Sequence, residues 1–262
     1  MGTILPHIEA LGERQTVILY DQRGGGRSDL PSDTTLLDAR HFIEDLEAVR
    51  QHFSLEQMTL LAHSFGAVLV SRYAQEHPGR VARMIFLGAT GPQRAQAAAA
   101  AQAAYASADT FTLEELMGVM SQLLTGTAVD PLAACRRYEE LSSSLSTSGE
   151  PSEWKGSSCG APTEAVAYYF RHTAQQTPAS FGDWDFTLGL EDVAAPLLVI
   201  HGEADSTGTE AQRAWASSLP DGRILLIPGA GKGAVAERPD LVLEAIEEFV
   251  AGTWPQRAES VQ

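Results

Sequence analysis

The stretch "LLAHSFGAVLV" at residues 60–70 decides which fold the chain is expected to have. Its first half is a short apolar run typical of a buried strand, and its second half fits the start of a helix. Ser64 stands at the junction, between the small residues Ala62 and Gly66. A sharp strand-to-helix turn needs small neighbours and exposes the serine hydroxyl as a nucleophile, with the backbone N–H of Phe65 as an oxyanion donor. The alternative is that Ser64 only caps the helix.

Four other apolar runs have the length and residue types of strands. They are "TVILYD" (16–21), "ARMIFLGA" (82–89), "APLLVIHG" (195–202) and "RILLIPG" (223–229). Their apolarity is continuous rather than alternating, which is typical of strands covered by helices on both faces of a parallel sheet. Helix-compatible segments separate them. The sequence therefore predicts an α/β fold with a doubly wound, mostly parallel sheet.

The strand signal disappears for about 100 residues in the middle of the chain, where the segments are compatible with helices. We therefore predict an α/β core made of residues 1–92 and 190–262, and a helical cap made of residues 93–189. Within the cap, the Gly/Ser/Pro-rich residues 146–162 are predicted to form a loop. An insert between strands of a parallel sheet lies over their carboxyl ends, where such folds bind ligands.

The composition excludes several functional classes. The net charge is −16 over 262 residues, with acidic residues spread along the chain, so we expect no nucleic-acid partner and no membrane surface. The two cysteines, Cys135 and Cys159, lack metal-ligand spacing, and we expect no metal, no cofactor and no disulfide framework. The sequence shows no signal-peptide pattern and no membrane-spanning apolar run, which predicts a cytoplasmic location.

Asp205 in "LLVIHGEADS" is the candidate acid of a catalytic triad. It comes after a predicted strand and after the insert, in the chain order Ser–Asp–His expected of this type of fold. The alternative is that Asp205 caps a helix starting near Thr209, and Glu203 is then the fallback acid. His63 and His201 lie at strand ends and are interpreted as structural.

The base should lie in "GAGKGAVAERPD", residues 229–240, which reads as a turn leading into a helix. No histidine occurs after His201, and Lys232 occupies the centre of this turn. Lysine occurs only twice among the 18 basic residues of the chain, so a basic residue placed here at random would more often be arginine.

Four stretches occur in an order that resembles the α/β-hydrolase superfamily. They are "VILYDQRGGGRSDLP", "LLAHSFGAVLVSRYAQEHPGRV", "PLLVIHGEADS" and "IPGAGKGAVAERPDLVLEAIEEF". Within the superfamily they are similar to the proline iminopeptidase-like branch, in which a D-Q-R-G-x-G-x-S loop comes after a strand. The resemblance implies that Ser64 is the nucleophile and Asp205 the triad acid. Lys232 then stands where the family has its triad histidine.

The resemblance also implies a difference at the N-terminus. Family members carry further strands and an H-G-G-P-G-type oxyanion loop before the segment that matches residues 4–24, so we expect an N-terminally shortened sheet. The predicted strand 16–21 must then pair directly with residues 58–63 or leave an exposed edge, which a homodimer could cover. Asp21, Arg23 and Ser28 belong to a loop that is mainly structural in the family.

Whether a lysine can replace the histidine depends on its protonation. A general base works best when its pKa lies near the working pH, whereas the ordinary pKa of lysine is about 10.4. Burial lowers a lysine pKa and a neighbouring carboxylate raises it. Four accounts of Lys232 therefore stay open: an ion pair with Asp205, a cation that stabilises a substrate oxygen, a desolvated base for Ser64, or a deliberate inactivating substitution.

The sequence thus predicts a serine hydrolase that cleaves a small ester, an amide or an N-terminal peptide residue, impaired by Lys232. A non-hydrolytic protein on the same scaffold is the alternative. The expected partner is a small molecule or a short peptide. Iminopeptidases in this branch bind the substrate amine with cap carboxylates, for which Glu139, Glu140 and Glu164 are available. Any helix surface offers such residues, so the substrate stays open.

Overall fold

The computed structural model describes residues 4–146, 156–205 and 209–261. The described residues form two compact units. Residues 4–45, 105–145 and 156–182 form one, here called the helical unit. Residues 46–104, 146, 183–205 and 209–261 form the other, the sheet unit. These boundaries differ from the predicted division into core and cap, which stays a prediction.

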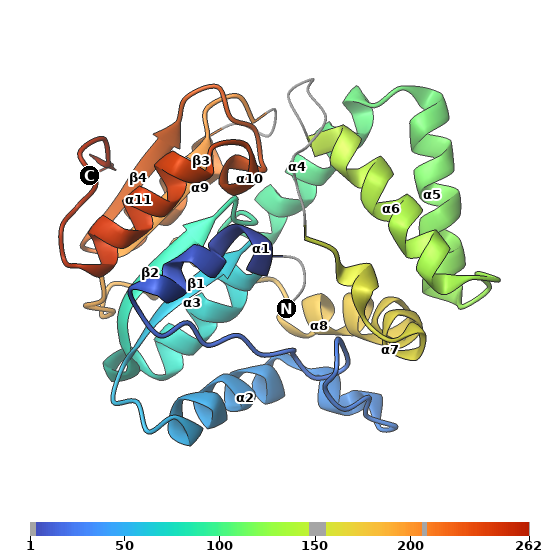
Figure 1. Cartoon of the computed structure of the whole chain (residues 1–262), viewed down its shortest axis with the longest axis horizontal. Coiled ribbons are helices and arrows are strands. Elements are labelled where there is room, and N and C mark those ends of the chain that lie inside the picture. Colours follow the sequence, from blue (N-terminus) through green and yellow to red (C-terminus); the bar gives the residue numbers. More distant parts are fainter. Residues whose placement is uncertain (1–3, 147–155, 206–208, 262) are drawn as a thin grey trace. The chain divides into compact units, whose positions relative to one another are not determined.

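The sheet unit contains five strands in the order β1-β2-β3-β4-β5, of which Figure 1 labels the first four. They are β1 (Met58–His63), β2 (Val81–Leu87), β3 (Leu197–Gly202), β4 (Gly222–Ile227) and β5 (Glu259–Ser260). The first four are parallel and the short β5 runs antiparallel to β4. Every residue of β3 is buried, as its continuous apolar sequence predicts. The prediction of a mostly parallel α/β sheet is confirmed.

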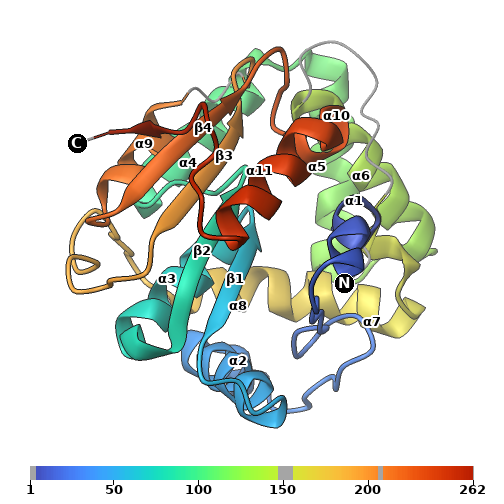
Figure 2. The ribbon, with the colours of Figure 1, turned by 60° about the vertical axis from the view of Figure 1, so that its left-hand side comes forward.

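Helices cover both faces of this sheet. They include α3 (Gly66–Glu76), α9 (Glu210–Ser217), the short α10 (Ala234–Glu237) and α11 (Pro239–Val250). Figure 2 shows α11 across one face and α3 and α9 on the other. Residues three apart on a strand point to opposite faces, and the contacts agree. On β2, Phe86 packs against Trp215 of α9 with ring centroids 5.1 Å apart, whereas Arg83 lies over Phe249 of α11.

The prediction of a strand at residues 16–21 is wrong. This stretch belongs to the helical unit, forms no strand in the structure, and is mostly half-buried. The predicted pairing with residues 58–63 is therefore not formed, and β1 lies at the end of the strand order of the described sheet. Apolar, β-branched sequence makes a segment compatible with a sheet, but a strand also requires backbone hydrogen bonds to a neighbouring strand.

The helical unit consists of short and medium helices, with two more that cross into the sheet unit. They are α1 (Leu5–Ile8), α5 (Thr110–Thr125), α6 (Pro131–Ser146), α7 (Thr163–Tyr168) and α8 (Ala174–Ser180), with α2 (Ala39–His52) and α4 (Arg94–Ser107) crossing the boundary. The sequence delimits α5 clearly. Asp109 caps it by accepting a hydrogen bond from the Thr112 amide (2.9 Å), and Gly126 ends it with φ of +70°. No helix of the described residues is both long and apolar enough to cross a membrane.

Cys135 and Cys159 form a single disulfide, which the sequence analysis did not predict. Cys135 lies in α6 and Cys159 in a single turn of 3-10 helix (Ser158–Gly160), and folding brings their Cα atoms to 5.7 Å. Both cysteines are buried in a cluster with Leu123, Val166 and Phe170. Two cysteines 24 residues apart carry no sequence signal of pairing, because pairing depends on this three-dimensional approach. Within the predicted loop 146–162, residues 147–155 lie outside the described residues.

The disulfide yields a stability prediction. Closing a loop of this length restricts the unfolded chain, so the Cys135→Ser/Cys159→Ser variant should unfold with a free energy about 3 kcal/mol lower than the parent. Urea denaturation with and without dithiothreitol measures this difference, and the reductant should have no effect on the variant. Two reactive thiols in the unreduced, unfolded parent would contradict the account.

A second prediction concerns a partly buried polar cluster between α2 and α3. The Glu47 carboxylate accepts hydrogen bonds from Arg50 (2.6 and 2.9 Å) and from the Tyr73 hydroxyl (2.8 Å). The Arg50 bonds hold the pKa of Glu47 well below its ordinary range, against the opposing effect of partial burial. A lowered folded-state pKa stabilises the protein above the unfolded-state pKa of about 4.3, and this contribution is lost as the pH falls below that value.

We therefore expect the unfolding free energy to fall between about pH 5 and pH 3, and Glu47→Gln to flatten that decline. Urea titrations across this range measure it. Glu56→Gln, which alters an exposed carboxylate of the same unit, is the matched control and should keep the parent's slope. Equal slopes for both variants would show that Glu47 does not carry this pH dependence.

Candidate functional site

Ser64 lies in a sharp turn between β1 and α3. Its φ is +53°, a left-handed conformation that non-glycine residues adopt rarely and at a cost in energy. Backbone hydrogen bonds hold this conformation: the Ser64 amide donates to the Leu87 carbonyl (3.1 Å), and the Ser64 carbonyl accepts from the amides of Thr90 (3.1 Å) and Ala67 (3.2 Å). A left-handed residue between a strand and a helix is the backbone geometry that a nucleophile elbow requires.

The residues on either side of Ser64 fit this turn. A Cβ added to Gly66 would lie 3.5 Å from the Cβ of Ala62, so larger side chains at these two positions would crowd each other. Phe65 is the N-cap residue of α3, with helical φ and ψ of −62° and −20°. Its amide therefore lies at the positive end of the helix dipole, which suits an oxyanion donor. Its ring packs edge-on against Trp184, with centroids 5.7 Å apart.

Asp205 comes after β3 and is almost fully buried. Its Oδ2 lies 3.6 Å from Nε2 of His201, and the side chains are 2% and 1% exposed. His201 pairs with Leu226 in the β3–β4 ladder. His201 is therefore a buried neighbour of Asp205, which fits the structural role expected of it.

The loop that carries Lys232 comes after β4 and lies against the carboxyl ends of β2 and β3. The Ala204 amide donates to the Ala230 carbonyl (2.9 Å). Glycine is required where the loop approaches the strands. A Cβ on Gly202 would clash with the carbonyl oxygens of Ala230 and Gly231. A Cβ on Gly88 would lie 3.0 Å from the carbonyl oxygen of Lys232. Gly88 directly follows the residue that accepts the Ser64 amide.

The side chain of Lys232 faces solvent, although its loop lies close to the ends of β2 and β3. It is exposed, and it forms no ion pair with any residue that the structure describes, including Asp205. The ion-pair account therefore has no counterpart in this structure. Exposure also removes the burial that a lysine base needs. Ser64, Asp205 and Lys232 come after β1, β3 and β4, which are parallel, so all three lie at the same edge of the sheet.

Sequence reasoning missed Glu237, which holds the Lys232 loop. Its Oε2 accepts a hydrogen bond from the Gly231 amide (2.8 Å). Glu237 is the last residue of α10, so the short helix brings the carboxylate back over the turn that precedes it. The signal is present, since Glu237 lies within one helical turn of a glycine-rich turn, but this pattern is not specific enough to predict the contact.

The other loop and cap residues that the sequence suggested lie in the helical unit. Arg23 forms two 2.6 Å hydrogen bonds with Asp45, and Ser28 donates to the Asp21 carbonyl. These contacts fit the structural role expected of that loop. Glu139 accepts hydrogen bonds from Ser157 and Ser158, Glu140 pairs with Arg137 (3.0 Å), and Glu164 is exposed. None of these contacts identifies a substrate site.

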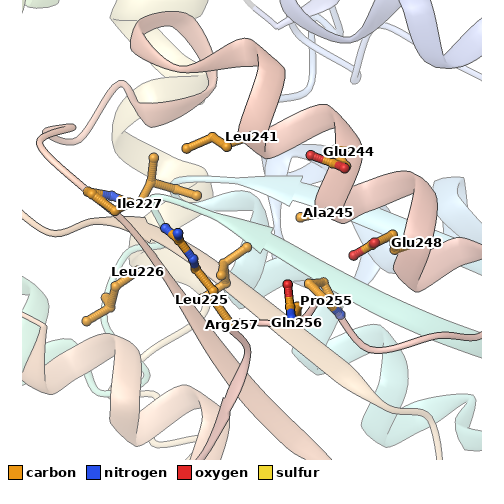
Figure 3. Close-up of a pocket in the computed structure, with 11 residues that line it drawn as sticks. Leu225, Leu226, Ile227, Leu241, Glu244, Ala245, Glu248, Pro255, Gln256 and Arg257 are labelled. Atoms are coloured by element: carbon orange, nitrogen blue, oxygen red, sulfur yellow. The ribbon is translucent and has the colours of Figure 1, made fainter.

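A cavity of about 240 Å³ lies between β4, α11 and the C-terminal segment (Figure 3). Its apolar wall includes Leu225 and Ile227, while Glu244, Glu248 and Arg257 lie at its sides. Because β4 is three positions from β1 in the sheet, this cavity is about 14 Å from the strand that leads to Ser64. It is therefore separate from the Ser64 turn.

Comparison with known proteins agrees with this geometry. The proline iminopeptidase of Heyndrickxia coagulans is 42% identical over 79 residues, which cover 30% of this chain and 27% of that protein. The non-heme haloperoxidase of Rhodococcus erythropolis is 26% identical over 237 residues, covering 89% of this chain and 81% of that protein. The crystal structure of the Mycobacterium smegmatis proline iminopeptidase superposes with a TM-score of 0.65 at 21% identity, covering 95% of this chain and 84% of that one.

The short match to the first of these proteins spans about a quarter of its length, and the structural match shows the fold alone. The model of the family described as alpha/beta hydrolase fold matches residues 4–239, most of the chain. In this fold a serine typically lies in a strained turn after a parallel strand, and an acidic residue comes after a later strand. Ser64 and Asp205 have these positions in the chain. The chain belongs to the alpha/beta hydrolase fold family.

Proposed function

We propose that this protein is a serine hydrolase that cleaves a small ester, an amide or an N-terminal peptide residue through Ser64. The observation that carries the proposal is the left-handed backbone of Ser64 at the junction of β1 and α3. A strained conformation of this kind is costly and persists only where the surroundings enforce it, and such residues cluster at functional sites. In this fold it projects the serine hydroxyl toward the ligand-binding edge of the sheet.

The proposed reaction is acyl transfer to Ser64. The Ser64 Oγ attacks the substrate carbonyl, and the Phe65 amide stabilises the oxygen that becomes negative. The bond from the carbonyl carbon to the alcohol or amine then breaks, that group leaves with the proton given up by Ser64, and water hydrolyses the acyl-serine ester. Asp205 and Lys232 complete the polar site. Lys232 stands where the related branch has its triad histidine, and its exposure leaves Ser64 without an efficient base. Loss of a triad member can lower turnover by about six orders of magnitude, so we propose that the activity is low.

The choice of substrate rests on the relatives. Two of the similar proteins are named proline iminopeptidases, which favours an N-terminal peptide residue and hence a substrate with a free amine. The proposed partner is accordingly a small molecule or short peptide, and residues 93–189 are proposed to form a helical cap. A homodimer is proposed on the open edge of β1 in the described sheet.

A non-hydrolytic function is the second candidate, and the Lys232 side chain favours it. An exposed ammonium with no carboxylate partner among the described residues can attract a negative substrate oxygen but lacks the surroundings of a base. A relative named a haloperoxidase matches over most of the chain, so the scaffold is not tied to peptide substrates. On this account Ser64 binds a substrate without forming a covalent intermediate.

The proposed cytoplasmic location rests on the sequence. The Cys135–Cys159 disulfide stands against it, because disulfides are rare in the reducing cytosol. Alkylation of thiols in intact cells before isolation measures whether this disulfide exists where the protein is made.

The hydrolase and non-hydrolase accounts differ in the effect of Lys232→His. A histidine at this position can accept the Ser64 proton near neutral pH, so we expect labelling of Ser64 by a fluorophosphonate to become at least about a hundredfold faster. Turnover of p-nitrophenyl esters and proline arylamides should rise with it. Mass spectrometry of the labelled protein measures the rate and the site.

Ser64→Ala in the Lys232→His background is the control and should abolish labelling. Lys232→Gln removes the ammonium without adding an imidazole. It should not accelerate labelling if the imidazole is what accepts the Ser64 proton. Labelling in neither the parent nor the Lys232→His variant would exclude the serine hydrolase. A basic limb near pH 8 in the unmutated protein's rate profile would instead assign the base to the lysine.

A further inference from the structure

The loop after β2 is bonded directly to the Ser64 turn. The Thr90 amide donates to the Ser64 carbonyl over 3.1 Å, and the Ser64 amide donates to Leu87, the last residue of β2. The carbonyl bond to Thr90 is one of those that hold Ser64 at φ of +53°. The position of Ser64 therefore depends on where the Ala89–Gly91 loop is held.

Three consecutive carbonyls of this loop each accept a hydrogen bond from a buried side chain. The three donors are 3%, 0% and 9% exposed, and they come from α9 and from the segment before β3. The bonds are Gln212 Nε2 to Ala89 (2.7 Å), Trp215 Nε1 to Thr90 (2.7 Å) and Trp184 Nε1 to Gly91 (3.4 Å). A carbonyl that folding removes from water loses its hydrogen bond to water. The folded state is destabilised unless a donor from the protein replaces that bond.

The two donors on α9 are themselves held rigidly. The Trp215 ring lies edge-on to Phe86 and stacks on Phe186, with centroids 5.1 and 5.8 Å apart. These contacts fix the direction of its N–H. Oε1 of Gln212 is buried and has no hydrogen-bond partner among the described residues, so the bond to Ala89 is the one that its amide makes. The loop also approaches α9 closely, because a Cβ on Gly91 would lie 3.5 Å from the Cβ of Ala211.

We propose that Gln212 and Trp215 are positioning residues for Ser64, acting through the Ala89–Gly91 loop and the Thr90 amide. Neither residue touches the reacting atoms. They anchor the loop to α9, the helix after the Asp205 turn, and so link the position of the nucleophile to the segment that carries the acid. A strained backbone persists only where its surroundings hold it, and this chain of bonds supplies part of that constraint. The proposal rests on the proposed serine hydrolase function.

The test removes each donor while keeping its bulk, in Gln212→Met and Trp215→Phe, both in the Lys232→His background. A small displacement of a nucleophile costs about tenfold to a hundredfold in rate. We therefore expect slower fluorophosphonate labelling of Ser64 and a lower kcat on p-nitrophenyl esters, with KM unchanged. Rates are normalised to the folded fraction measured by circular dichroism, so a loss of folding alone does not register as slower labelling.

Ser217→Ala is the matched control, because Ser217 lies on α9 and its hydroxyl donates to the Arg213 carbonyl of the same helix, its one partner among the described residues. It should label at the parent rate. Amide hydrogen exchange at Thr90 is the second readout, and it should be faster in both donor variants but not in the control. If the parent labels and the donor variants label equally fast with unchanged exchange, the positioning role is overturned. If neither the unmutated protein nor the Lys232→His protein is labelled, the proposed hydrolase and the positioning role are overturned together.

Discussion

The site depends on one strained residue, the left-handed Ser64 between β1 and α3. Its amide and carbonyl are bonded to the end of β2 and to the loop after it, so the turn cannot relax without moving the neighbouring strand. Small residues at 62 and 66 allow the chain to turn this tightly. Because the strands are parallel, the loops after β3 and β4 lie at the same edge of the sheet as the Ser64 turn, and residues far apart in the sequence gather there.

The Lys232 loop illustrates how a backbone can be held closely while its side chain stays exposed. Because Gly88 and Gly202 have no side chains, the carbonyls of this loop can approach the ends of β2 and β3 closely. The Glu237 carboxylate holds the loop by accepting a hydrogen bond from the Gly231 amide. The backbone position is thus well determined, yet the ammonium lies in solvent and is not paired with Asp205. On the proposed hydrolase account, this loop holds the position of the triad base and presents an exposed lysine there.

Much of the sheet could be predicted from the sequence, because continuous apolar runs ending in small or polar residues have few other interpretations. The Ser64 turn was predictable for the same reason. The run at 16–21 shows the limit, since apolar sequence does not specify a strand partner. The Cys135–Cys159 bond, the His201–Asp205 contact and the donors on α9 were not predictable, because each depends on which segments approach one another in space.

The central claim is that the backbone of this chain presents Ser64 as a nucleophile and that Lys232 limits its reactivity. The most direct measurement is the site and extent of fluorophosphonate modification in the parent and in Lys232→His, mapped by peptide mass spectrometry. The account predicts a single adduct, on Ser64, formed slowly in the parent and much faster in the variant. An adduct on another residue, or none in either protein, would contradict it.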